Sequence, residues 1–92
     1  VYAEEVIRTL PKIINPEKSF EVEYSSQQGF AITETIKGGC LPSKINRLFL
    51  KGGTVTETFT APKSGSCEFT GKYGFIFCGL FRCQYAMFFT NL

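Results

Sequence analysis

Residues 66–92 read SCEFTGKYGFIFCGLFRCQYAMFFTNL, and this stretch decides our prediction of the fold. It holds three of the four cysteines, six of the ten phenylalanines and the single methionine of the chain. A membrane-spanning helix needs about 20 apolar residues without a central arginine, whereas Arg82 lies inside this stretch. Its glycines, cysteines and aromatic residues instead favour buried strands, so we predict no membrane span.

Glycines divide this stretch into strands. Residues 71–74, GKYG, are expected to form a four-residue hairpin connection between a strand at 67–69 and a strand at 75–78. Residues 85–90 are then expected to form a last, buried strand.

The four cysteines predict two disulfides. If the two strands pair around the expected turn, Cys67 and Cys78 lie opposite each other, close enough for a bond. The second bond would then join Cys40 to Cys83. Four cysteines allow three pairings. We prefer this one, and the other two stay open.

Further strands are expected upstream. Residues 19–24 alternate apolar side chains with serine and glutamate, which is the pattern of a half-buried strand. Residues 30–36 and the threonine-rich residues 54–60 are predicted as strands as well. Residues 41–50 fit either a helical turn or a strand that leads into a two-residue hairpin at 52–53, and we favour the hairpin.

The N-terminal residues predict a helix. The apolar residues of 2–10 recur at spacings of three and four, which places them on one helical face, and Pro11 is expected to end the helix. The whole pattern predicts a β-rich α+β fold. In it, the N-terminal helix packs on a small antiparallel β-sandwich or barrel of about six to seven strands.

Length and cysteine content indicate one compact, disulfide-stapled domain over residues 1–92. A chain of 92 residues is small for a single hydrophobic core, and each disulfide would add roughly 2–4 kcal/mol. An even cysteine count in a short chain is typical of secreted proteins. The N-terminus VYAEE lacks the features of a signal peptide, so we expect a mature, processed form in an oxidising, extracytosolic compartment.

Composition excludes several kinds of chemistry. The chain has no histidine and no aspartate, so Ser-His-Asp triads, Cys-His pairs and histidine-ligated metal sites are impossible. The net charge is −3 over residues 1–36 and +5 over residues 37–92, but the lysines are scattered, unlike the dense basic clusters of nucleic-acid binders. We therefore expect no enzymatic activity, no cofactor, no metal and no nucleic-acid partner.

Glu34 and Glu57 lie at the centres of two similar segments, ITETI and VTETF. Strict alternation places each carboxylate on the same face as its apolar neighbours, where a charge needs a partner. One interpretation is a pair of carboxylates acting as acid and base. The other, which we favour, is a salt bridge at the rim of the sheet to Lys37, Arg47 or another cation.

The sequence CGLFRCQYAM at 78–87, which follows an aromatic strand, resembles the C-terminal loop of cupredoxins. In that family a copper-binding cysteine is followed at fixed spacing by histidine and methionine. Cys78 and Met87 match this pattern, and Cys83 stands at the histidine position. A blue-copper centre needs two imidazoles, which this chain lacks, so the resemblance implies a metal-free cupredoxin-like module with a disulfide at the former site.

The aromatic C-terminal face is the candidate interface. Strand alternation cannot turn every aromatic residue of this stretch inward, and we assign contact to Phe81, Arg82, Tyr85, Phe88 and Phe89. We expect a small exported binding protein that contacts another protein, as effectors, toxins and inhibitors do. The alternatives are the metal-free cupredoxin-like module and an accessory subunit docked onto a larger assembly by this face.

Overall fold

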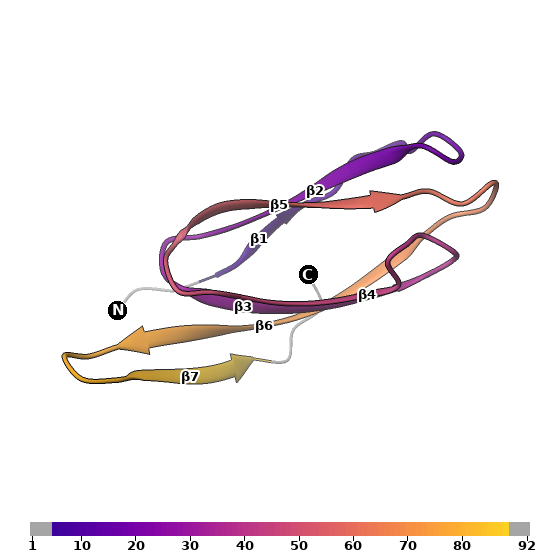
Figure 1. The fold of residues 1–92 in the computed structure, drawn as a ribbon. Coiled ribbons are helices and arrows are strands. Elements are labelled where there is room, and N and C mark those ends of the chain that lie inside the picture. Colours follow the sequence, from indigo (N-terminus) through magenta and orange to yellow (C-terminus); the bar gives the residue numbers. More distant parts are fainter. Residues whose placement is uncertain (1–4, 89–92) are drawn as a thin grey trace.

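Two facing antiparallel sheets make up the computed structural model, which describes residues 5–88, the side chains of 77, 78 and 84–88 excepted (Figure 1). Within the described residues the strands are β1 (Ile7–Thr9), β2 (Ser19–Ser26), β3 (Phe30–Lys37), β4 (Lys44–Phe49), β5 (Gly53–Thr60), β6 (Glu68–Cys78) and β7 (Cys83–Phe88). One sheet has the order β1-β2-β5 and the other β4-β3-β6-β7. The predicted antiparallel β-sandwich is confirmed.

The predicted N-terminal helix is wrong for the residues that the structure describes. Residues 7–9 form the short strand β1, which pairs antiparallel with β2. The helical interpretation fails because Ile7 and Leu10 remain exposed and only Val6 of the described apolar residues in this segment is buried. So short a segment is also marginal as an isolated helix. Between residues 5 and 88 the structure has no helix, and hence none that is long and apolar enough to cross a membrane.

Residues 19–60 form one long two-stranded ribbon that is folded in half. β2 pairs with β5 and β3 pairs with β4 in a single continuous register, which runs from Ser19 opposite Thr60 to Thr35 opposite Lys44. The ribbon crosses from one sheet to the other at residues 27–29 and 50–52, and Figure 1 shows the two crossings at the same end of the molecule. Folding the ribbon therefore produces the two facing layers.

Glycine is required where the two crossings meet. A Cβ atom on Gly29 would lie 2.6 Å from the carbonyl oxygen of Leu50, and one on Gly52 would lie 2.4 Å from that of Gln27. The strand predicted within 41–50 is confirmed by β4. The two-residue hairpin at 52–53 is wrong, because β4 and β5 belong to different sheets.

Strand β6 is continuous over 11 residues, where the sequence predicted a hairpin. It pairs with β3, so that Gly71 lies opposite Glu34 and Gly74 lies opposite Ala31. Glycine inside a strand often marks a place where another group approaches closely, and Gly71 adds no side chain beside Glu34. The turn lies instead at residues 79–82, and β7 follows it close to the predicted last strand.

The disulfide pairing differs from the prediction. Cys40 is bonded to Cys67, so the expected bonds Cys67–Cys78 and Cys40–Cys83 are wrong. The reason is the continuity of β6, which separates residues 67 and 78 by the length of a strand. Cys83 is also disulfide-bonded, and the register of β6 and β7 places its backbone opposite Cys78.

The hydrophobic core lies between the two sheets. Its buried residues come from both layers and are Val6, Val22, Tyr24, Phe30, Ile32, Ile36, Cys40, Ile45, Phe59 and Phe75. Near the disulfide, the ring of Phe59 stacks on Phe20 with centroids 5.8 Å apart and meets Phe69 edge-on at 5.2 Å. At this end the connection between β3 and β4, residues 38–43, is held against the end of β5. The backbones of Leu41 and Thr60 exchange two hydrogen bonds of 3.0 and 2.8 Å.

Candidate functional site

A charged network is buried inside the sandwich, with one residue from each of β1, β2 and β3. The Glu34 side chain has no exposed surface, and the Arg8 side chain is 6 % exposed. The Tyr24 hydroxyl donates a hydrogen bond of 2.5 Å to Glu34 Oε2, and the Arg8 guanidinium donates to Oε1. The guanidinium carbon also lies 5.9 Å from the centre of the Phe69 ring. A buried carboxylate requires such partners.

Burial controls the protonation of this network. It raises the pKa of Glu34 above the ordinary value, while the hydrogen bond from Tyr24 and the charge of Arg8 oppose the rise. Burial also raises the pKa of Tyr24, and the hydrogen bond to Glu34 raises it further. The network therefore connects strands β1, β2 and β3 through side chains. The Glu34 carboxylate has no exposed surface, so a substrate in solution cannot reach it.

Glu57 of β5 has a separate partner on β4. Its Oε1 lies 3.2 Å from Nε of Arg47, with the two side chains 15 % and 45 % exposed. The favoured interpretation of a rim salt bridge is confirmed for Glu57 with Arg47. For Glu34 it is wrong, because that side chain is fully buried and its cation is Arg8. The two carboxylates lie in different sheets and each is held by its own arginine, so the geometry does not assemble an acid–base pair.

Sequence reasoning missed the partners of Glu34. Arg8 lies within the segment for which the sequence predicted a helix, and the error in secondary structure concealed its inward direction. Tyr24 carried a usable signal, because the alternation of residues 19–24 placed it on the same face as Val22. A tyrosine on a core-facing position requires a hydrogen-bond partner for its hydroxyl, and Glu34 provides it.

The tip of the β6–β7 hairpin, residues 79–82, presents two adjacent apolar side chains to solvent. Leu80 is 95 % exposed and Phe81 is 97 % exposed, and Arg82 beside them is also exposed. The turn is closed by a 2.8 Å hydrogen bond from the Gly79 amide to the Arg82 carbonyl. In Figure 1 this tip is the free end of the hairpin, away from the ribbon.

The structure therefore places two of the five predicted interface residues together. Phe81 and Arg82 are neighbours at the hairpin tip. Tyr85 and Phe88 belong to β7, with side chains outside the described part, and Phe89 lies outside the described residues altogether. Leu80 was missed because the sequence predicted the turn of this region at residues 71–74, whereas the structure places it at residues 79–82.

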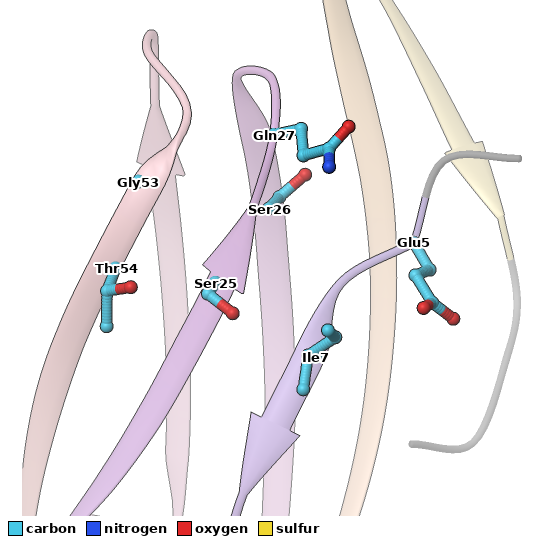
Figure 2. Close-up of a pocket in the computed structure, with 7 residues that line it drawn as sticks. All are labelled: Glu5, Ile7, Ser25, Ser26, Gln27, Gly53 and Thr54. Atoms are coloured by element: carbon cyan, nitrogen blue, oxygen red, sulfur yellow. The ribbon is translucent and has the colours of Figure 1, made fainter. Parts of the chain in front are cut away.

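Among the residues that the structure describes, several surface pockets can be compared. The first, of about 270 Å³, is lined mainly by polar residue types, and Figure 2 shows these residues on neighbouring ends of β1, β2 and β5. They are Glu5, Ile7, Ser25, Ser26, Gln27, Gly53 and Thr54. The second is an apolar cleft of about 320 Å³ beside Cys67, and the third lies around Leu48 of β4. Neither Glu34 nor Glu57 lines any of these three pockets.

The described residues contain no cluster of three acidic or cysteine side chains that could hold a metal ion. Of the positions that resemble a cupredoxin loop, Cys83 is disulfide-bonded, and the side chains of Cys78 and Met87 are outside the described part. No protein-family model, no curated protein and no solved structure matches the chain. The geometry alone therefore has to support a function, and its most distinctive accessible feature is the apolar hairpin tip.

Proposed function

We propose that this chain is a small, non-enzymatic binding protein that contacts another protein through the tip of its β6–β7 hairpin. The observation that carries the proposal is the pair Leu80 and Phe81, adjacent and 95 % and 97 % exposed. Apolar side chains this exposed are unfavourable in water, and aromatic residues and arginine are the usual energetic centres of protein interfaces. Phe81 and Arg82 provide both types side by side.

The hairpin also supports the tip mechanically. Antiparallel pairing runs from Tyr73 opposite Phe88 to Cys78 opposite Cys83, immediately before the turn. A paired hairpin with a closed turn loses little conformational freedom when it binds, and this kind of preorganisation increases affinity. The tip is therefore suited to insert as a rigid convex element into a concave surface.

The rest of the molecule supports a role without catalysis. The chain has no histidine or aspartate, Glu34 is enclosed, and Glu57 is paired with Arg47. The disulfide Cys40–Cys67 is compatible with an oxidising compartment outside the cytosol. These features support an exported protein of the kind to which effectors, toxins and inhibitors belong.

The test compares matched surface variants. The oxidised chain is immobilised, a saturably bound protein is isolated from the extracellular fraction of its source, and the affinity is then measured by calorimetry with the purified partner. We expect Phe81→Ser and Leu80→Ser to weaken binding at least about tenfold. Leu48→Ser is the control, because Leu48 is also exposed but lies on β4. Unchanged affinity of both tip variants would contradict the proposal.

A further inference from the structure

Exposed large apolar side chains gather at the two ends of this elongated molecule, which measures 49 × 24 × 20 Å. One end carries the hairpin tip with Leu80 and Phe81, and Leu50 is exposed at the crossing of the ribbon. The crossing lies beside β6, because the amide of Ile76 donates to the carbonyl of Gly29 at 3.0 Å. This end therefore holds a protruding apolar element.

The opposite end holds an apolar cleft of about 320 Å³. It opens between the loop at 10–14 and the first residues of β2 and β6, next to the Cys40–Cys67 disulfide. Its main apolar walls are Leu10, Ile13, Ile14, Phe20 and Phe69. Ile13 is 84 % exposed at its mouth, so this end presents a concave apolar surface to solvent.

Strand β6 separates the cleft from the tip. Phe69 near its start lines the cleft, and Gly79 after its end begins the tip. A strand of 11 residues with a rise of about 3.3 Å per residue spans roughly 33 Å between its first and last residues. The tip therefore cannot enter the cleft of its own chain.

We propose that the hairpin tip of one molecule inserts into the cleft of a second copy, so that copies associate head to tail. This inference rests on the proposed function, because it takes the same tip as the contact surface and names a second copy of this chain as the partner. An apolar cavity of about 150 Å³ accommodates a benzene ring, so the cleft has space for the Phe81 ring and the Leu80 side chain. The contact joins two different surfaces at opposite ends of the molecule, so each copy offers one tip and one cleft and further copies can add head to tail.

The size of the end faces predicts weak association. The cross-section is 24 × 20 Å, so an end-to-end contact buries roughly 1,000 Å² in total, below the range of about 1,200–2,000 Å² for stable complexes. Charges near the cleft are mixed, because Lys12 lines it and Glu68 adjoins its lining residues. We therefore expect an apolar contact with a dissociation constant on the order of 0.1–1 mM and little dependence on salt.

Sedimentation equilibrium of the oxidised chain, up to about 1 mM, tests the association. We expect the weight-average mass of the wild type to rise with concentration, while Phe81→Ser and Ile13→Glu each remain monomeric. An equimolar mixture of these two variants should form dimers and nothing longer, because it contains one intact tip and one intact cleft. Leu48→Ser is the control and should associate like the wild type. A wild type that stays monomeric, or association that both variants retain, overturns the inference.

A tryptophan reporter distinguishes this inference from the proposed function. The chain has no tryptophan, so Phe81→Trp places a single indole at the tip. We expect its emission to shift to shorter wavelength when the Phe81→Ser chain is added in excess, and not when the Phe81→Ser/Ile13→Glu chain is added. No shift with either chain overturns self-association. If Phe81→Ser then still abolishes binding to a different protein, the proposed function stands and only self-association is excluded. If the emission shifts with anionic vesicles alone, both self-association and the proposed function are overturned.

Discussion

Among the described residues, Glu34 is a charged side chain that is fully buried in the core, so its partners matter for the stability of the fold. Its carboxylate has no exposed surface and is held by Arg8 and Tyr24 from two other strands. Removal of one partner from a buried ion pair leaves an uncompensated charge and is far more costly than removal of a surface partner. Gly71, opposite Glu34 on β6, adds no side chain to the space beside it. The network therefore links β1 to β3 through side chains, in addition to the backbone pairing of β1 with β2.

We expect Arg8→Met to destabilise the protein by roughly 3–5 kcal/mol, because Glu34 then remains buried without its cation. The matched control is Arg47→Met, which removes the partner of Glu57 in a pair with a half-exposed arginine side chain. This change should cost about 0–1 kcal/mol, as expected for exposed pairs. Urea unfolding followed by far-UV circular dichroism measures both. If both variants lowered the free energy of unfolding equally, the buried ion pair of Glu34 would contribute no more to stability than the partly exposed pair of Glu57.

Tyr24 predicts a loss of stability at alkaline pH. Its pKa is raised in the folded protein from the ordinary value of 10.0, chiefly by burial. The folded state therefore holds the Tyr24 proton more tightly than the unfolded state does. The contribution of this proton to the free energy of unfolding is fully present below pH 10 and is lost as the pH rises above that value. We expect one tyrosine to ionise only on unfolding in a titration followed by absorbance. Tyr24→Phe should remove that late step, and its persistence in the variant would assign it to another tyrosine.

At the scale of elements, the folded ribbon of residues 19–60 explains the layered architecture. Its two strands stay paired in one register while both cross between sheets at 27–29 and 50–52. The crossings touch through backbone atoms at Gly29 and Gly52. A side chain there would push the two crossings apart and misalign the sheets that follow.

Gly29→Ala is expected to destabilise the fold by roughly 1–3 kcal/mol, since its Cβ would meet backbone that cannot rotate away. Gly79→Ala is the control, because the nearest atom to its Cβ would be 3.8 Å away, in ordinary contact. The control should change stability by no more than about 0.5 kcal/mol. Thermal unfolding of the two variants measures the difference. If Gly29→Ala were as stable as the wild type, the close contact between the two crossings would not contribute to the stability of the fold.

Elements with strong alternation could be predicted from the sequence, and those defined by distant partners could not. β2 and β3 were found because the buried face of each carries mainly apolar residues at every second position, while most of the residues between them are polar. β1 was read as a helix because three residues contain no alternation that could reveal its pairing with β2. β6 was divided in two because Gly71 and Gly74 resemble turn residues when the facing strand β3 is unknown.

The candidate site was predictable to a similar extent. Phe81 and Arg82 were predicted as interface residues from the aromatic character of the C-terminal stretch, but their position at a hairpin tip depends on the pairing of β6 with β7 and was not predicted. The cysteine pairing could not be predicted locally. It depends on the length of β6 and on the pairing of Leu41, next to Cys40, with the distant residue Thr60. Arg8 as the partner of Glu34 likewise depends on a contact between residues 26 positions apart.

For the molecule as a whole, the disulfide joins Cys40, in the connection between β3 and β4, to Cys67, the residue immediately before β6. Trypsin digestion without reduction should yield peptides 38–44 and 64–72 as one linked species, because these contain Cys40 and Cys67. Replacing both residues by serine should cost about 3–4 kcal/mol for a loop of this length. Mass spectrometry and urea unfolding measure the two effects. Linkage of peptide 38–44 to a later cysteine peptide would contradict this arrangement.

The continuous register of the folded ribbon also implies an order of events during folding. Pairing starts between Thr35 and Lys44, nine residues apart, and ends between Ser19 and Thr60. Each new pair closes a loop only slightly larger than the last, so the entropy of loop closure is lost in small steps. We expect Ile45→Val to slow folding more, relative to its equilibrium destabilisation, than Phe59→Leu. Stopped-flow refolding tests this, and equal ratios would indicate that the two halves of the ribbon form together.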